Sequence, residues 1–380
     1  MNNNTLRNLA IAAVILTVIA LLVSLSDNNP ERTSESLIPG LEARINEINS
    51  IEVFSAGDEL VVKLVPSENG WISDTNGGYP ADIGRVRRNV IALAEANIEE
   101  QKTAQPENYS RLGVEDISDA SASGVMISLN LPDESHRIIL GDSGVSGGAY
   151  SYARLAGEAQ SVLVSGTFDV SKSVEDWLDI SFLDISSAEI QSIQIQHPDG
   201  ETLSIAKMEP DDTDFRVENI PPNRELNYAG VANTLGSVLS SLDLLDVGPA
   251  EQFDAGDTEP VIAIFNLFDG TVITAKTWQE EDNVKHAFSA TVDEKRANAF
   301  VADTVAELEA SGENAESDAD TIAAIVDAEN ITLSAIQQGA DELNEQLTPW
   351  IYSLPAYKWE QLVRRMEDLL KNNSLPGPPQ

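Results

Sequence analysis

The 380-residue sequence has no cysteine, three histidines and four methionines, and its 23 lysine and arginine residues face 63 aspartates and glutamates. Without cysteine, the chain has no disulfide, no thiolate nucleophile and no cysteine-ligated zinc. The net charge of −40 makes binding to a phosphate backbone unfavourable, so nucleic acid is not expected as a partner. Adaptation to a salt-rich habitat is an alternative explanation of the acidic composition, and it implies no specific function.

The three histidines do not form a metal-binding pattern. His136 is expected at the start of a strand, His197 in a turn and His286 within a strand, and no two stand at the spacing of metal ligands. The acidic clusters 211–214 and 318–320 lack the glycine and the distal glutamate of an EF-hand loop. We therefore predict neither a metal nor a cofactor, and calcium binding at an acidic cluster is left open.

One apolar run, residues 9–25, contains no charged residue. A helix of this length reaches about 26 Å, close to the thickness of a bilayer's hydrocarbon core. Arg7 precedes the run and Asp27 follows it, so the positive-inside rule places residues 1–8 in the cytoplasm. A cleaved secretory signal is the alternative, with a cleavage site near Ser24. We expect a single uncleaved helix in the bacterial inner membrane and the bulk of the chain in the periplasm.

The exported region begins with a linker, residues 26–36, and continues into a first α+β repeat, residues 37–186. The linker is rich in polar and charged residues, which favours a flexible segment. A helix is predicted from the N-cap Asp82, because apolar residues then recur at helical spacing. Strands are predicted at 51–53, 60–65, 71–72, 125–131, 137–140, 149–155 and 162–164.

The second half of the chain repeats this pattern, which predicts a second α+β repeat at 187–300. Asp82 and its apolar stripe correspond to Asn227 and a similar stripe 145 residues later. Residues 125–131 resemble 261–267, and 149–153 resemble 286–290, at offsets near 136, so the second copy should have a shorter loop. Three further pairs at an offset of 144 are Lys63 with Lys207, Pro66 with Pro210, and Trp71 with Phe215.

The predicted fold class is therefore α+β: a transmembrane helix, then two tandem repeats of an antiparallel or mixed sheet with a covering helix, then C-terminal helices. Residues 301–345 are rich in alanine and acidic residues and are predicted to form helices. A C-terminal strand and an amphipathic helix are expected within 346–371. Residues 372–380 are predicted to be a disordered tail.

Two short motifs suggest a hydrolase, but neither has the required local structure. Ser146 lies in a G-x-S-x-G pattern, which needs a strand before it and a helix after it, whereas a strand is predicted after it. Ser204 and Lys207 match S-x-x-K but fall in a predicted strand, where positions three apart face opposite sides. We predict no enzyme. The alternative is an exported hydrolase using Ser146 with His197 or His286.

Two basic clusters stand out against the acidic composition. Arg85, Arg87 and Arg88 lie opposite the apolar stripe of the first predicted helix, and Arg364 and Arg365 lie on the closing helix. Pairing with the chain's own carboxylates is one interpretation. The other is a docking site for an acidic partner protein, so these five arginines are the predicted partner-binding residues.

Several segments together resemble the bacterial family catalogued as domain of unknown function 4340. They are 37–41, 71 with 78–82, 106–113, 177–180 and 350–370. The resemblance implies one amino-terminal anchor and an accessory role beside ABC-transporter components of the gliding-motility type, with no catalytic residues. The leading hypothesis is a non-catalytic periplasmic adaptor; besides the hydrolase, the alternative is a small-ligand-binding module between the two repeats.

Overall fold

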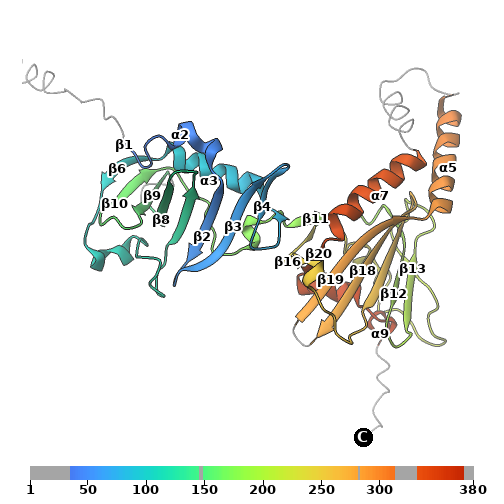
Figure 1. Ribbon diagram of the computed structural model, residues 1–380. Helices are drawn as coiled ribbons and strands as arrows, with labels where there is room; N and C mark the ends of the chain where they lie inside the picture. Colours follow the sequence, from blue (N-terminus) through green and yellow to red (C-terminus); the bar gives the residue numbers. More distant parts are fainter. Residues whose placement is uncertain (1–34, 145–148, 281–282, 313–331, 372–380) are drawn as a thin grey trace, which may run out of the picture. The chain divides into compact units, whose positions relative to one another are not determined.

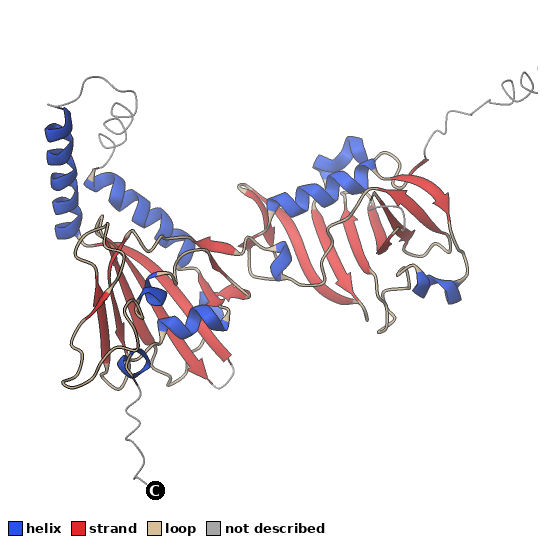
Figure 2. Ribbon diagram, turned by 180° about the vertical axis from the view of Figure 1, so that it is seen from behind, coloured by secondary structure: helices blue, strands red, loops and turns tan. Residues whose placement is uncertain are grey.

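The computed structural model describes residues 35–144, 149–280, 283–312 and 332–371. The protein is mixed α+β, with two large antiparallel sheets and C-terminal helices (Figures 1 and 2). It divides into two compact units, residues 1–60 with 87–170 and residues 61–86 with 171–380. The predicted membrane span 9–25 lies outside the described residues. Among the helices that the structure describes, none has the length and hydropathy of a membrane span.

The first sheet has ten strands in the order β1-β6-β10-β9-β8-β7-β2-β3-β4-β5. Its strands are β1 Glu35–Ser36, β2 Ser50–Ser55, β3 Glu59–Ser67, β4 Gly70–Ser73, β5 Tyr79–Pro80, β6 Asn97–Gln101, β7 Val125–Asn130, β8 Ser135–Ser143, β9 Tyr150–Leu155 and β10 Ser161–Ser165. The helical segments of this half are α2 Leu41–Arg44, η1 Ile45–Glu47, α3 Ile83–Glu95, η2 Pro106–Arg111 and η3 Glu175–Trp177. All the strands predicted for the first repeat are confirmed.

The predicted cap of α3 is also confirmed. The backbone N–H of Arg85 donates to Oδ1 of Asp82 at 2.9 Å, which satisfies one of the free amides of the first turn. Val86, Val90 and Leu93 on the predicted stripe are buried. The N-cap therefore predicted the start of this helix. Helical periodicity predicted its buried face except at Ile83, the first residue of the stripe, which is 40% exposed.

The loop between β6 and β7, residues 102–124, packs on the first sheet and is anchored by one buried arginine. Tyr109 and Val114 of the loop form a small core with Met126 of β7. Arg154, 2% exposed, donates from Nε to the carbonyl of Val114 at 2.8 Å and from Nη2 to Asp116 at 2.5 Å. Its guanidinium also lies 4.5 Å from the centre of the Tyr109 ring.

The second sheet has eight strands in the order β14-β13-β12-β17-β18-β19-β20-β16. Its strands are β12 Ile190–Gln196, β13 Thr202–Ala206, β14 Arg216–Val217, β16 Asp246–Pro249, β17 Val261–Leu267, β18 Thr271–Glu280, β19 Asn283–Val292 and β20 Trp350–Ser353. A separate pair joins β11 Ser181–Leu183 to β15 Leu242–Asp243. The helical segments are α4 Asn233–Gly236, η4 Ala250–Gln252, α5 Glu294–Gly312, α7 Leu333–Leu347, α8 Ala356–Leu362 and α9 Met366–Leu369.

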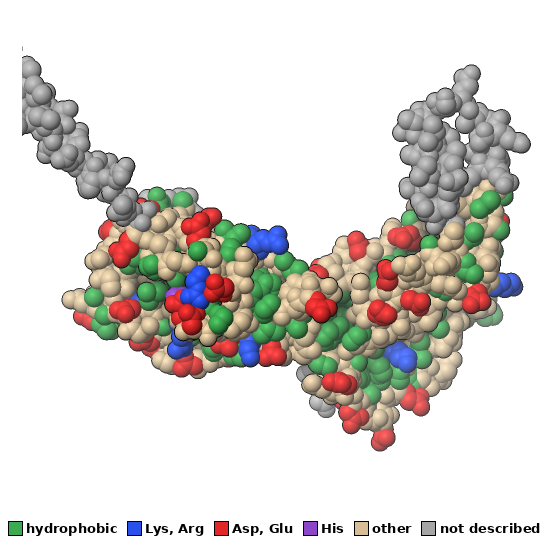
Figure 3. Space-filling model, turned by 45° about the horizontal axis from the view of Figure 1, so that its top comes forward, with side chains coloured by type: hydrophobic (Ala, Val, Ile, Leu, Met, Phe, Trp, Pro, Cys, Tyr) green, Lys and Arg blue, Asp and Glu red, His purple; other side chains and the backbone are tan. Residues whose placement is uncertain are grey.

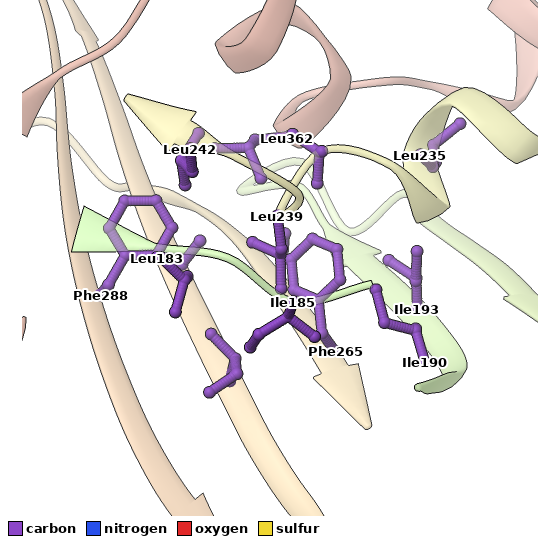
Figure 4. Packing of buried hydrophobic residues seen from close by; sticks show 14 of the residues in the cluster. Leu183, Ile185, Ile190, Ile193, Leu235, Leu239, Leu242, Phe265, Phe288 and Leu362 are labelled. Carbon is purple, nitrogen blue, oxygen red and sulfur yellow. The ribbon is translucent and has the colours of Figure 1, made fainter. Parts of the chain in front are cut away.

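One face of the second sheet forms the core of this unit. Phe265 of β17 and Phe288 of β19 are buried on that face, as the alternation of side chains along a strand requires. Leu183 of β11, Leu242 of β15 and Leu362 of α8 pack over them (Figure 4). Leu347 of α7 belongs to the same cluster, so several elements share the covering of one sheet face.

The two sheets have the same strand topology. Eight neighbouring strands of the first sheet lie in the order β4-β3-β2-β7-β8-β9-β10-β6, and the second sheet has the order β14-β13-β12-β17-β18-β19-β20-β16. When the strands of each set are numbered along the chain, the two spatial orders are identical. The ladder that pairs Ser50 with Asn130 also matches the one that pairs Ser192 with Asn266. The loop before β17 is shorter than the loop before β7, as the change of offset predicted.

The same correspondence extends to the chain segments that follow the sheets. The backbone N–H of Asp82 donates to the carbonyl of Trp177, and that of Asn227 donates to the carbonyl of Leu369, both at 2.9 Å. The residues just before them form isolated bridges, Ala81 with Leu178 and Leu226 with Leu370. Asp82 and Asn227 therefore hold equivalent positions, as the offset of 145 predicts.

The helix predicted after Asn227 is wrong. Only the four-residue α4 forms there, and the Asn227 side chain donates to the carbonyl of Asp368 at 3.4 Å instead of capping a helix. Gly230 has a φ of +76°, a left-handed conformation that an α-helix does not admit. Glycine and serine are also frequent in this stretch and are poor helix formers.

The C-terminal segment differs from its prediction in one respect. The strand predicted near 348–354 is confirmed as β20, but the single closing helix is wrong, since α8 and α9 are separate. Arg365 has an extended backbone, φ −108° and ψ 161°, and its N–H donates to Asp368 at 2.9 Å as the cap of α9. The helices predicted in 301–345 are confirmed as α5 and α7, while 313–331 lies outside the described residues.

Candidate functional site

A long insertion separates β19 from β20 in the second sheet. The equivalent strands β9 and β10 are joined by residues 156–160, whereas residues 293–349, with α5 and α7, join β19 to β20. The start of α5 is fixed to the β17–β18 turn, because the N–H of Asp293 donates to the carbonyl of Gly270 at 2.9 Å. A Cβ at Gly270 would lie 2.5 Å from the Ala297 nitrogen, so only glycine permits this approach.

The second inserted helix, α7, is held against the sheet. Thr332 caps it, since its Oγ1 accepts a hydrogen bond from the N–H of Ala335 at 3.1 Å. Asn344 accepts from the N–H of Ala290 in β19 at 3.1 Å, and Ala340 and Leu347 are buried. Figure 1 shows α7 lying across β18 and β19 with α5 beside it. The described helices of the insertion, α5 and α7, thus form an arm at one end of the sheet.

The arm leaves a groove of about 490 Å³ beside the sheet, within the size range of ligand-binding sites. The groove is lined mainly by apolar side chains: Ile185, Leu267, Asp269, Thr271, Phe300, Ala335, Ile336, Gly339, Ala340 and Leu343. Asp269 accepts from the N–H of Thr271 at 2.8 Å and from its hydroxyl at 3.0 Å. Because the remaining lining residues have no polar side-chain atom, the groove suits an apolar ligand.

One wall of the groove consists of small residues on α7. Ala335 and Gly339 are one helical turn apart and exposed, while Ile336 and Leu343 beside them are half-buried. Phe300 of α5 lies on the groove as well and is half-buried. Small side chains flanked by larger ones let another backbone come close to α7.

The surface around the groove is acidic. The insertion 293–349 has fourteen acidic residues and two basic ones, Lys295 and Arg296. Arg296 forms an ion pair with Asp293 at 3.3 Å. Figure 3 shows acidic side chains scattered over the surface, with few basic ones between them. The groove therefore combines an apolar lining with a negative surrounding potential.

A second distinctive feature is a buried polar row across β18, β19 and β20. Thr277 pairs with His286, and His286 pairs with Tyr352, and all three are at most 1% exposed. The equivalent row of the first sheet is apolar: Leu140, Ala153 and Val162. The predicted match of 149–153 with 286–290 identified the equivalent strands, β9 and β19. Its register is wrong, because it aligns Ala149 with His286, whereas the strand pairing places Ala153 at the position of His286. The bulge between Leu140 and Ser143 is one reason.

His286 is held in its neutral form. Its Nδ1 lies 3.0 Å from the Thr277 hydroxyl oxygen, and its Nε2 has no hydrogen-bond partner among the described residues. Burial, with repulsion from Lys285 as a smaller contribution, lowers the pKa of His286 to about 3. Because His286 is 0% exposed, it cannot meet a substrate from solvent in this conformation.

The structure describes only part of the residue set predicted for the hydrolase alternative. Ser146 lies outside the described residues. His197 is buried at a turn with Nε2 3.2 Å from the Arg364 carbonyl oxygen. Lys207 donates from Nζ to the carbonyl of Ser187 at 2.9 Å. The strand location predicted for Ser204 is confirmed, and it separates the two members of the S-x-x-K motif.

The predicted docking arginines have different surroundings. The Arg85 guanidinium lies 5.9 Å from the ring centre of Trp177, and Arg88 is 3.3 Å from an Asp169 oxygen. Arg87 is exposed, and the described part of the chain gives it no ion pair.

The two arginines near α9 also have contacts within the protein. Arg364 donates from Nε to Gln361 at 3.3 Å. Arg365 pairs with Asp199 at 2.9 Å and with Glu201. Pairing with the protein's own carboxylates therefore accounts for Arg365, and a docking role for the five arginines stays a prediction.

Comparison with known proteins gives one match. Residues 71–261 match the family described as Domain of unknown function (DUF4340). No curated protein and no solved structure matches the chain. The matched region includes α3 and ends at the first residue of β17, so the α5–α7 arm and its groove follow it in the sequence.

Proposed function

Because the chain belongs to the family Domain of unknown function (DUF4340), which names no activity, we propose a function from its architecture. The protein is a membrane-anchored accessory protein of the bacterial cell envelope that binds a partner protein and is not an enzyme. Residues 9–25 form the anchor in the inner membrane, and the remainder lies in the periplasm. The partner is a subunit of an ABC-type transport system of the gliding-motility kind.

We further propose that the two sheets arose by duplication of one α+β module. The shared strand order, the matching Ser50–Asn130 and Ser192–Asn266 pairs, and the equivalent positions of Asp82 and Asn227 support this origin. In this scheme the first repeat ends near 186. The second extends past 300, because β20 completes its sheet after the inserted arm.

The observation that carries the binding function is the groove at the inserted arm. Insertions on a rigid scaffold commonly carry function, because the scaffold holds them in place. Here the arm creates an apolar, solvent-accessible surface on a chain of net charge −40. Such a surface is typical of a protein interaction site.

Co-purification from native membranes tests this proposal. The tagged full-length chain is crosslinked, extracted in several mild detergents, and its partners are identified by mass spectrometry. We expect transporter subunits in the crosslinked fraction. Recovery of the protein alone in every detergent, with and without crosslinker, would contradict the proposal.

Charge reversal tests the predicted arginines in the same assay. Arg87→Glu changes an exposed residue of α3, and Arg137→Glu, at an exposed position of β8, is the matched control. If Arg87 contributes to docking, its variant should recover several-fold less partner while the control matches the wild type. Equal recovery by both variants would exclude Arg87 from the interface.

A further inference from the structure

We propose that the groove between α5, α7 and the end of the second sheet binds an amphipathic helix of a partner protein, with lysine or arginine beside the helix's apolar face. The inference rests on the proposed function only in treating the chain as a binding protein. It specifies the chemistry of the partner segment and the place where that segment binds.

The dimensions of the groove fit the side chains of one helix face. Ala335 and Leu343 are eight residues apart on α7, which spans about 12 Å along the helix axis. Anchors at i, i+4 and i+7 of a bound helix span about 10 Å. A cavity of about 490 Å³ accommodates several such aliphatic side chains.

The wall of small residues favours a helix over a bulkier or flatter ligand. Ala335 and Gly339 present little side chain, and their exposed positions form a shallow track along α7. A partner helix can therefore approach the α7 backbone closely, with its larger side chains pointing toward the buried lining residues Leu267 and Ile185. This is the helix-in-groove mode of recognition.

The charge of the surroundings selects a basic helix. The exposed residues Glu294, Asp303, Asp341 and Glu342 lie on the two helices that form the groove. A helix with lysine or arginine at the margins of its apolar face would be attracted, and an acidic helix would be repelled. An anionic membrane surface is disfavoured for the same reason.

Charge also argues against two other occupants. The chain's own residues 313–331 include six acidic residues and no basic one. A second copy of the chain would bring a net charge of −40 against another of −40. A basic partner helix satisfies both the apolar lining and the acidic surroundings, and these two occupants do not.

The test is fluorescence anisotropy with the full-length chain in detergent. The probe is a labelled peptide of about 18 leucine and lysine residues, arranged so that the leucines form one helical face. The control peptide has the same composition in scrambled order. We expect the amphipathic peptide to bind at least tenfold more tightly than the scrambled one. Equal affinities would mean that charge alone attracts the peptide, and the proposal would fail.

A groove-filling variant locates the binding site. A Cβ at Gly339 meets nothing within 4 Å, so Gly339→Leu should fold and place its side chain in the groove. We expect this variant to bind the peptide at least tenfold more weakly. Gln346→Leu, at an exposed α7 position outside the groove, should leave the affinity unchanged. Unchanged affinity in Gly339→Leu would overturn the proposal.

Two further measurements identify other occupants. If replacing residues 313–331 with a glycine–serine linker raised the peptide affinity tenfold, the chain's own segment would be the occupant. Binding to phosphatidylglycerol vesicles that Gly339→Leu abolishes would assign the groove to lipid. Either result would overturn the proposal. If the chain bound the peptide but did not co-purify with transporter subunits, only the proposal of an ABC-transport partner would be contradicted.

Discussion

Asn266 on β17 donates from Nδ2 to the hydroxyl of Ser192 on β12 at 3.0 Å. Asn130 on β7 makes the same bond to Ser50 on β2, also at 3.0 Å. Both pairs lie directly opposite each other at the same place in equivalent ladders. A shared polar pair at the same register is stronger support for duplication than similar hydrophobic patterns, which many unrelated strands share.

The two asparagines should differ in their contribution to stability. Asn130 also accepts from the hydroxyl of Ser135 at 2.7 Å, so Asn130→Ala removes more than one hydrogen bond. We expect Asn130→Ala to lower the free energy of unfolding by about 2 kcal/mol and Asn266→Ala by about 1 kcal/mol. Urea denaturation of each variant measures the difference, and a larger loss for Asn266→Ala would contradict this ranking.

The equivalent residues Asp82 and Asn227 should respond differently to alanine. Asp82→Ala removes the side-chain cap of α3 and should destabilise the protein by about 1 kcal/mol. Asn227→Ala removes only a 3.4 Å hydrogen bond to Asp368 and should change stability by a few tenths of a kcal/mol. Thermal and urea unfolding of both variants measures this. Equal losses would show that Asn227 has a capping role after all.

These two positions show what the sequence could predict of the fold. The alternation of apolar residues identified the strands of the first repeat, and the offset of 145 matched Asp82 to Asn227. The helix predicted after Asn227 is wrong, because an apolar stripe does not suffice for a helix where glycine and serine residues disfavour one. The left-handed turn at Gly230 stops a helix whatever the spacing of the apolar residues.

Arg154 should be essential for the order of the 102–124 loop. Replacing it with methionine keeps apolar volume but leaves the carbonyls of Val114 and Glu158 without a donor. Glu158 is exposed, so water can replace the donor to its carbonyl, whereas the carbonyl of the buried Val114 would stay unsatisfied. Because an unsatisfied buried carbonyl costs about 1–3 kcal/mol, we expect a loss of about 2 kcal/mol. Protease cleavage within 102–124 should also become faster.

The matched control for Arg154 is Arg137→Met, since Arg137 is exposed on β8. This variant should unfold and be cleaved like the wild type. If Arg154→Met left the cleavage rate of the loop unchanged, the anchoring role of this arginine would be disproved.

His286 should make the second unit sensitive to acid. Its pKa is lowered to about 3 in the folded protein, whereas an unfolded histidine titrates near pH 6.5. The stabilisation from keeping it neutral is therefore complete above pH 6.5. It is lost as the pH falls toward 3, because the unfolded state then binds the proton. Over this whole range the loss is on the order of 5 kcal/mol, since one pKa unit corresponds to about 1.4 kcal/mol.

The effect is measured as the difference in the free energy of unfolding between the wild type and His286→Leu. The many carboxylates affect both proteins alike and cancel in this difference. The wild type should lose stability relative to this variant between pH 6.5 and pH 4 at constant ionic strength. Parallel pH profiles for wild type and His286→Leu would rule out the effect.

The candidate site was harder to predict than the fold. The acidic helices of 301–345 were predicted, but the groove depends on Ile185 and Leu267, which come from distant segments of the chain. Only the folded arrangement shows that α7 presents Ala335 and Gly339 to this space. A sequence signal did exist, since both residues are small and four positions apart, but such pairs are frequent in alanine-rich helices.

The insertion between β19 and β20 also affects the order in which the protein folds. Pairing β9 with β10 requires the closure of residues 156–160, but pairing β19 with β20 requires the closure of 293–349, roughly ten times as many. The longer loop adds about 2 kcal/mol of closure entropy, and contacts distant in sequence form slowly. During synthesis the first sheet can complete its β9–β10 hairpin early. The second must leave β19 unpaired on the β20 side until residues beyond 350 have been made, which leaves a strand edge open to pairing with other chains for longer.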